Sequence, residues 1–180
     1  LQRSPQLEYN YTKNYDIGLG YNFAPKPVSI EPFKKVKIFS KTKAFDLIKD
    51  INFNFLPSNL TFRSDIARDY NAQKLRNIAE EDFLVIEPTY FKSFTWTRTY
   101  NVKYPITKAL QIDFNAVNQS RIDEEPGELN TAAKRDSVKR NIMQGGRNIN
   151  YQHSINASYT LPFSKIPILN WISSSASYAS

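Results

Sequence analysis

The sequence predicts an all-β fold, a segment of an antiparallel transmembrane β-barrel with about six strands and long extracellular loops. Three observations predict it. Apolar and polar residues alternate over long segments, aromatic residues gather at the ends of those segments, and short connections alternate with long ones. Six strands are fewer than the eight that a membrane barrel needs, so we expect the 180 residues, 1–180, to be a fragment of a longer barrel.

The clearest alternation lies in residues 7–23. Eight of the nine odd-numbered positions are apolar or aromatic, with Lys13 as the exception, and all eight even-numbered positions are polar or glycine. At about 3.3 Å per residue, the predicted strand is longer than most strands of soluble proteins. It therefore has the length and the single apolar face of a membrane-spanning strand.

The same alternation recurs along the rest of the chain. Phe53 and Phe55 open the second segment, and Pro57 interrupts it as a bulge or kink would. The last segment begins near Ile168. These patterns predict five further strands, near residues 52–70, 92–104, 109–122, 148–161 and 168–180.

The connections between the predicted strands differ in length. A tight turn at 105–108 and a short link at 162–167 fall on one side, which we assign to the periplasm. Long charged links at 71–91 and 123–147 fall on the other side. Because successive connections alternate between the two sides, residues 24–51 are assigned to the periplasmic side as an insert. A short basic helix is predicted at 131–143, ending at Gly145-Gly146.

One face of the predicted strands carries aromatic residues at both ends around an aliphatic middle. Two such girdles are typical of a lipid-facing surface. A soluble β-sandwich with an aromatic core stays open as the alternative. The predicted lipid-facing aromatic residues are Tyr9, Tyr11, Trp96 and Tyr151 at the extracellular end, and Tyr21, Phe23, Tyr104 and Trp171 at the periplasmic end.

The opposite face is rich in neutral polar residues. It carries no ring of one charge sign, which ion-selective pores use. Neutral polar side chains suit a wide, water-filled lumen, although ordinary solvated strand faces would look the same. The predicted lumen-facing residues are Asn10, Thr12, Asn14, Thr97, Asn101, Asn115, Gln152 and Asn156.

Three cations interrupt the apolar face: Lys13, Arg68 and Arg98. A charge at the membrane midplane costs about 2–4 kcal/mol. Arg98 lies six residues above Tyr104, roughly 14 Å along a tilted strand, so it falls near the middle. We therefore expect Arg98 to face protein, unless the placement is off by a few residues.

Residues 24–51 hold seven lysines and three acidic residues, which predicts either a docking site for a periplasmic partner or a soluble linker. Together with Arg98, the candidate partner contacts are Lys34, Lys35 and Lys37.

Catalytic and metal-binding chemistry has little support in the sequence. With no cysteine and one histidine, His153, the chain has no multi-histidine or cysteine-ligated metal site. The acidic run at 123–128 matches no EF-hand loop and predicts a solvated loop rather than a calcium site. The basic helix at 131–143 could bind nucleic acid, but a charged extracellular loop beside anionic lipopolysaccharide is the favoured interpretation. We expect no enzymatic activity and no cofactor.

Seven stretches, in order along nearly the whole chain, resemble the SprA (Sov) family of outer-membrane translocons of the type IX secretion system in Bacteroidota. They lie at residues 50–62, 68–71, 73–77, 94–98, 119–124, 145–148 and 161–171. The resemblance implies a very large single-chain barrel, at the upper limit of about 36 strands. It also implies export of folded cargo with C-terminal signals, including gliding adhesins and secreted enzymes. The partners that it implies are a PorV-like barrel and a periplasmic plug protein.

The leading hypothesis is therefore a wall segment of a protein-conducting channel in the cell outer membrane. Its expected partners are secreted cargo proteins, outer-membrane lipid and lipopolysaccharide. A TonB-dependent or porin-like solute transporter is the first alternative, and it would need a plug domain or a constricting loop. A soluble β-rich adhesin module is the second alternative.

Overall fold

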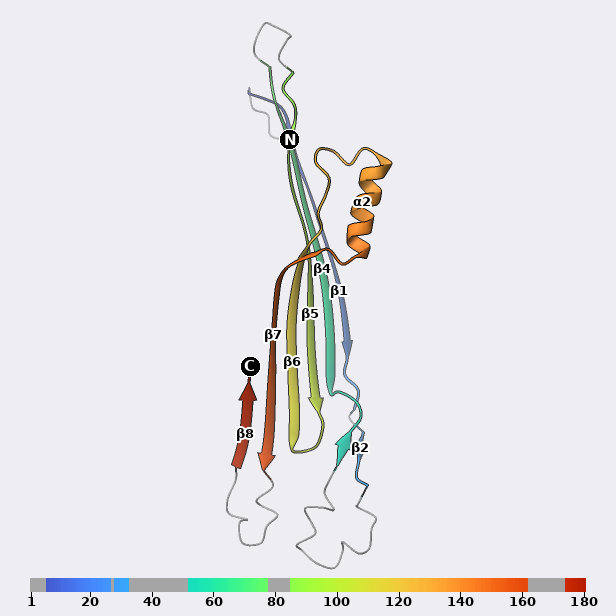
Figure 1. Ribbon diagram of the computed structural model, residues 1–180, viewed down its shortest axis with the longest axis vertical. Helices are drawn as coiled ribbons and strands as arrows, with labels where there is room; N and C mark the ends of the chain where they lie inside the picture. Colours follow the sequence, from blue (N-terminus) through green and yellow to red (C-terminus); the bar gives the residue numbers. More distant parts are fainter. Residues whose placement is uncertain (1–5, 27, 33–51, 78–84, 162–173) are drawn as a thin grey trace, which may run out of the picture. The chain divides into compact units, whose positions relative to one another are not determined.

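The computed structural model describes residues 6–26, 28–32, 52–77, 85–161 and 174–180. Within these ranges the chain is mostly β, with eight strands and one helix. Six strands form one sheet in the order β1-β4-β5-β6-β7-β8, and β2 pairs with β3 in a second sheet (Figure 1). The prediction of an all-β chain is confirmed. The six-stranded sheet is open, with β1 and β8 at its edges.

Strands β1, β5, β6 and β7 lie within three residues of the predicted segments, whereas β4 begins and ends later than the predicted 52–70. Three of them, β1, β4 and β5, are 17 residues long, and β1 and β5 are rich in the aromatic and β-branched residues that favour extended backbone. Residues 168–173 of the last predicted strand lie outside the described residues. The observed bounds are β1 Leu7–Phe23, β4 Asn59–Leu75, β5 Thr89–Pro105, β6 Leu110–Arg121, β7 Arg147–Leu161 and β8 Ser174–Ala179.

The second predicted strand, 52–70, is wrong at its start. Its first residues form β3, Phe53–Asn54, which leaves the large sheet and pairs antiparallel with β2, Ser29–Ile30. The strand resumes at Asn59 and continues to Leu75. Pro57 has no N–H to donate to a ladder, so the chain changes sheets at the position where a bulge was predicted. Most of the predicted insert 24–51 lies outside the described residues.

The chain divides into two compact units, of which unit 1 comprises Leu1–Leu19, Ser64–Arg98 and Asn118–Tyr151. Its hydrophobic core consists of Phe94 from β5, Ile122 from the loop after β6 and Val138 from α2 (Ala132–Met143). The partly buried side chains packed against this core are Ile66, Trp96, Leu129 and Ile142. The helix and its loop therefore cover the side of the sheet that carries Phe94.

The predicted helix is confirmed as α2. The Thr131 hydroxyl accepts a hydrogen bond from the Lys134 N–H and caps the first turn. Gly145 and Gly146 adopt positive φ angles of 82° and 72°, which end the helix where the sequence predicted. None of the helices in the described residues is long and apolar enough to cross a membrane.

Unit 2 comprises Gly20–Arg63, Thr99–Val117 and Gln152–Ser180. The predicted tight turn joins β5 to β6, and the Thr107 hydroxyl accepts hydrogen bonds from the N–H groups of Ala109 and Leu110. Asn54 of β3 donates its backbone N–H to the Ile106 carbonyl and its side-chain amide to the Pro105 carbonyl. The two-stranded sheet thus holds this turn.

Candidate functional site

The apolar alternate positions share one face of the strands, which we call the apolar face. In unit 1 the rings of Tyr11 and Tyr70 lie 6.0 Å apart, so odd positions of β1 and even positions of β4 point to the same side. In unit 2 the rings of Phe62 and Tyr100 lie 5.1 Å apart across β4 and β5. The polar alternate positions form the opposite, polar face.

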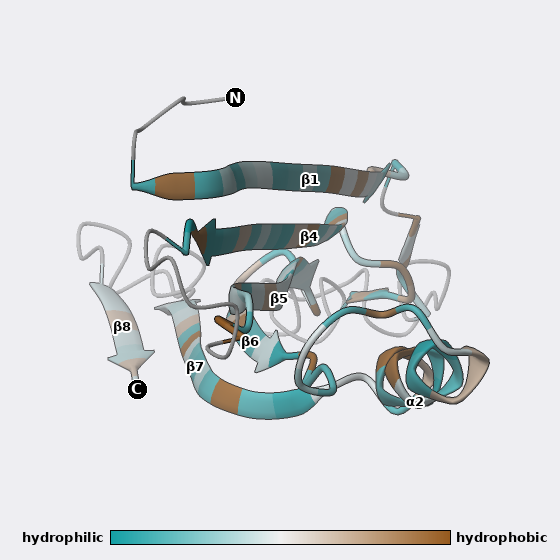
Figure 2. Ribbon diagram, turned by 90° about the horizontal axis from the view of Figure 1, so that it is seen from above, coloured by the Kyte–Doolittle hydropathy of each residue, from teal (hydrophilic) through white to brown (hydrophobic). Residues whose placement is uncertain are grey.

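The apolar face of β1 is uncovered over most of its length. Tyr15, Ile17, Leu19, Tyr21 and Phe23 are between 40% and 69% exposed, with Leu19 the most exposed. Apolar and polar bands follow one another along this strand in Figure 2. Such a row of large exposed side chains is typical of a surface that contacts protein or membrane.

The predicted lipid-facing aromatic residues fall into three groups. Tyr21, Phe23 and Tyr151 are exposed. Tyr9 and Tyr11 are half-buried in a row of ring contacts that continues to Tyr70 and Tyr90. Tyr104 is half-buried and donates its hydroxyl to the Asn54 carbonyl, and Trp171 lies outside the described residues.

Trp96 is partly covered by its own chain. Its ring packs against the core beneath α2, and its indole N–H donates to the Ser64 hydroxyl at 2.7 Å. The Arg98 guanidinium lies 4.7 Å from the ring centroid on another side. Alternation predicts the face that carries Trp96, but the loop that folds back over this face is distant in sequence. Trp96 is therefore half-buried beneath α2, and its contact with lipid stays a prediction.

Arg98 binds groups of its own chain. Its Nη2 donates to the side chains of Asn118 and Ser120 at 2.9 and 2.8 Å, and to the Gly145 carbonyl at 3.2 Å. The last contact places a cation at the C-terminal end of α2, where the helix dipole favours it. Arg98 thus faces protein, as expected, and a contact to a partner stays a prediction. Lys34, Lys35 and Lys37 lie outside the described residues.

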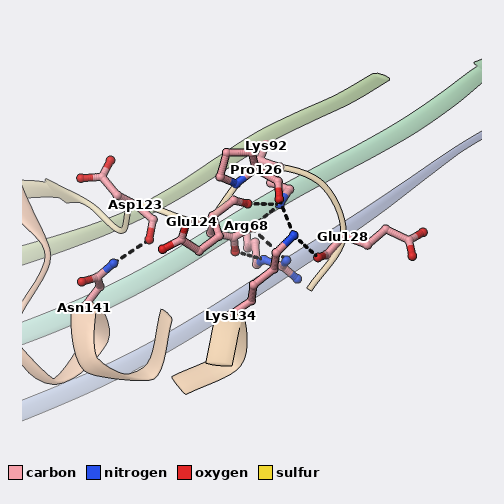
Figure 3. Close-up of polar contacts among 9 residues, drawn as sticks. Arg68, Lys92, Asp123, Glu124, Pro126, Glu128, Lys134 and Asn141 are labelled. Carbon is pink, nitrogen blue, oxygen red and sulfur yellow. Dashed lines mark hydrogen bonds and ion pairs between the residues drawn. The ribbon is translucent and has the colours of Figure 1, made fainter. Parts of the chain in front are cut away.

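The acidic loop is not simply solvated, because Glu124 is buried. Its side chain is 3% exposed and pairs with Arg68, whose Nε and Nη2 donate at 2.5 and 3.1 Å. The Lys92 ammonium lies 3.9 Å from the same carboxylate. Arg68, the second cation on the apolar face, is therefore neutralised from the loop (Figure 3).

Further polar contacts fix the loop and helix onto the sheet, and we call residues 122–146 the cap. Lys134 donates to the carbonyls of Pro126 and Glu128, and Asn141 donates to the Asp123 carbonyl (Figure 3). The Asp123 carboxylate pairs with Arg147, and this hydrogen bond lowers the pKa of Asp123. No group of metal-ligating side chains occurs in the described part of the chain.

The polar face carries the predicted lumen residues. The Asn71 amide donates to Asn10 and to Thr12, at 2.9 Å each, and so ties β4 to β1. Thr97 and Asn101 are half-buried, whereas Asn14, Asn115, Gln152 and Asn156 are exposed. These side chains are neutral, and they leave donors and acceptors open to water.

No protein-family model matches the chain, and no curated protein matches it. The functional interpretation therefore rests on the apolar face, the polar face and the cap. The sequence alone did not show that Lys92 joins Arg68 and Glu124. Lys92 is an even-numbered residue of the same strand as Phe94 and Trp96, so period-two alternation places it on the apolar face. The search for cations on this face, which identified Arg98, could therefore have identified Lys92 as well.

Proposed function

We propose that this chain is part of the wall of a protein-conducting β-barrel in the cell outer membrane, the translocon of type IX secretion. The single observation that supports the membrane wall is the exposed apolar row of β1, opposite a polar face on the same strand. In this proposal the apolar face contacts lipid and the polar face lines the lumen.

The free energy of the exposed row favours lipid over water. Fully removing a large aliphatic or phenylalanine side chain from water is worth about 1.5–3 kcal/mol. The five side chains of the row are 40–69% exposed, so each gains only a part of such a transfer free energy when lipid covers it. A soluble sheet with this face open would associate through it. Lipid satisfies the row without burying the polar face, and this favours a barrel wall over a soluble adhesin module.

The open edges of the sheet support a larger structure. β1 is an edge strand of 17 residues, and a long unpaired edge is a template for further strand pairing. In lipid, every backbone N–H and C=O group must be paired within the protein. Further strands beside β1 and β8 would meet this need and extend the wall.

Protein cargo is supported by the polar face and by the resemblance to SprA-like translocons. Neutral side chains such as Asn14, Asn115 and Asn156 offer weak, unselective contacts, which suit passage of folded proteins with C-terminal signals. In the same proposal a PorV-like barrel and a plug protein gate the channel. A solute transporter would instead need a plug domain or a constricting loop.

Single-cysteine labelling tests the wall, because this chain has no cysteine of its own. In intact cells, a membrane-impermeant maleimide should label cysteine at Asp16 and Asn22 but not at Ile17, Leu19 or Tyr21. Equal labelling of both sets, together with release of the protein by alkaline carbonate, would support the soluble module instead.

A photo-crosslinking amino acid tests the cargo. Placed at Asn14 on the polar face, it should trap secreted proteins during export, whereas at Ile17 it should trap only lipid. Crosslinks from Asn14 confined to small solutes or to no cargo, with the labelling pattern intact, would favour a TonB-dependent or porin-like transporter.

A further inference from the structure

We infer that the outer side of α2 binds the phosphorylated headgroups of lipopolysaccharide in the outer leaflet. The inference rests on the proposed function, because it needs the apolar face to contact lipid. It is carried by the position of the cap on that face and by unpaired cations on the helix.

The cap stands on the apolar face. Val138 of α2 is buried against Phe94 of β5, and Ile142 packs on the same cluster. Phe94, Trp96 and Arg98 occupy the even positions of β5, which belong to the apolar face, and Arg98 holds the Gly145 carbonyl at the end of the helix. The helix therefore lies on the side of the sheet that is opposite to the polar face.

The same unit leaves neighbouring apolar side chains uncovered. Tyr15, Ile17 and Leu19 of β1 are more than half exposed, and Ile149 and Tyr151 of β7 are 50% and 55% exposed. If lipid covers these side chains, α2 lies outside the barrel and beside the bilayer rather than in the lumen.

The outer side of α2 is basic. The helix turns Lys134, Ser137, Val138, Asn141 and Ile142 inward, and these side chains are buried or half-buried. The exposed side carries three cations and one acid, together with one apolar side chain that is 75% exposed. These residues are Arg135, Lys139, Arg140, Asp136 and Met143.

Two of these cations are free to bind. Within the described residues, the side chains of Lys139 and Arg140 make no hydrogen bond or ion pair, whereas the Arg135 guanidinium donates to the carbonyls of Asn130 and Thr131. A guanidinium and an ammonium one residue apart suit a phosphate monoester, and Met143 one turn further can reach the acyl boundary. Each cation near an anionic surface strengthens binding about 5-fold.

Reconstitution of the intact protein in nanodiscs tests the inference. A cysteine introduced by Met143→Cys carries an environment-sensitive fluorophore, and lipopolysaccharide is added in increasing amounts to a phosphatidylcholine bilayer. Lys139→Gln with Arg140→Gln should raise the half-saturating concentration of lipopolysaccharide about 30-fold. Lipopolysaccharide stripped of its lipid A phosphates should weaken binding of the unsubstituted protein by a similar factor.

Two controls make the result specific. Lys26→Gln with Lys103→Gln removes the same charge at exposed positions outside the cap, and it should leave the half-saturating concentration unchanged. Lys139→Arg with Arg140→Lys keeps the charge and should keep the affinity. If the half-saturating concentration of lipopolysaccharide does not depend on Lys139 and Arg140, or on the phosphates, the inference is wrong. That result is expected if the two cations bind an acidic protein instead.

The labelling of β1 separates this failure from failure of the proposed function. If labelling alternates along β1 while the double glutamine variant binds like the unsubstituted protein, only the inference fails. If labelling does not alternate, the lipid-facing wall fails and the inference fails with it.

Discussion

Arg68 and Glu124 show how a charge can occupy an apolar face. The arginine interrupts the alternation of β4, but the loop after β6 supplies a carboxylate that is almost fully buried. The guanidinium also lies 5.7 Å from the Tyr70 ring centroid and 6.0 Å from that of Phe94. Paired and stacked in this way, the charge attaches the cap instead of disrupting the face.

Breaking this pair should loosen the cap. We expect Glu124→Gln to destabilise the attachment of the cap by roughly 2–3 kcal/mol, because it leaves Arg68 without its anionic partner. This is less than for a fully buried pair, since the Arg68 side chain keeps 23% exposure. Hydrogen exchange of the α2 amides measures the opening free energy.

The matched control for Glu124→Gln is Asp123→Asn, one residue earlier. The Asp123 pair with Arg147 is exposed on both sides, at 51% and 64%, so its loss should leave the stability of the cap nearly unchanged. Equal effects of the two substitutions would show that burial of Glu124 does not matter to the cap.

The Asp123–Arg147 pair should respond to acid. Hydrogen bonding by Arg147 lowers the pKa of Asp123 from its ordinary 3.8, so the folded state holds this proton more weakly than the unfolded state. The stabilisation is present above about pH 4 and is lost as the pH falls through the lowered pKa. Exchange protection of the amides at 145–147 should drop in that range, and Asp123→Asn should remove this step. An identical drop in the variant would assign the step to another group.

At the scale of elements, α2 is a short and mostly polar helix that depends on the sheet for its stability. A 12-residue helix is marginal by itself, and only Val138 of α2 is buried. Its two ends are tied to other residues, through the Thr131 cap at the start and through Arg98 at the end. The helix is therefore as stable as its attachments.

Removing the C-terminal attachment should fray the helix. We expect Arg98→Gln to weaken the cap by about 1–3 kcal/mol, because the Gly145 carbonyl and the Asn118 and Ser120 side chains lose a charged donor. Limited proteolysis within 139–147 should become faster. Arg121→Gln, at a 53% exposed side chain, is the control and should leave cleavage unchanged. Equal cleavage in both variants would contradict the role of Arg98.

The turn after the helix has room for glycine only. A Cβ at Gly146 would lie 2.8 Å from the Ile122 side chain and 2.9 Å from the Arg121 carbonyl oxygen, in a backbone with φ of 72°. Gly127 has a similar φ of 74°, but its Cβ would meet only the end of the Lys134 side chain, at 3.5 Å.

Gly146→Ala should therefore cost more than Gly127→Ala. Both substitutions carry backbone strain of about 1 kcal/mol, and only the first adds a clash with backbone, which we expect to contribute at least about 1 kcal/mol more. Exchange protection of α2 in the two variants measures the difference. Similar values would mean that the strand end beside Gly146 moves freely.

At the scale of the whole molecule, period-two alternation predicted the strands and the two faces. The observed β1 coincides with the predicted 7–23, because alternation is strongest there. Alternation could not predict that Phe53 pairs with β2 or that Trp96 and Glu124 are covered. Both depend on which distant segment of the chain lies beside a strand or folds over a face. Alternation shows that a face is apolar and does not show whether lipid or protein covers it.

Adjacent arginine substitutions test what covers β1. Leu19 is 69% exposed on the apolar face, and a Cβ at Gly20, its neighbour on the polar face, would meet nothing within 4 Å. If lipid covers Leu19, Leu19→Arg should lower the free energy of unfolding by about 2–4 kcal/mol, whereas Gly20→Arg should change it by less than about 1 kcal/mol. Urea unfolding of the intact protein in lipid gives both values. A small effect of both would place Leu19 in water.

The pairing of β2 with β3 also bears on the order in which the chain assembles. Asn54 binds the turn between β5 and β6, about 50 residues later in the chain, so its contacts have no partner until that hairpin exists. Hairpins between consecutive strands close quickly, whereas contacts of long sequence separation form slowly. The β5–β6 hairpin should therefore form first, and the contacts of Asn54 with its turn should form afterwards.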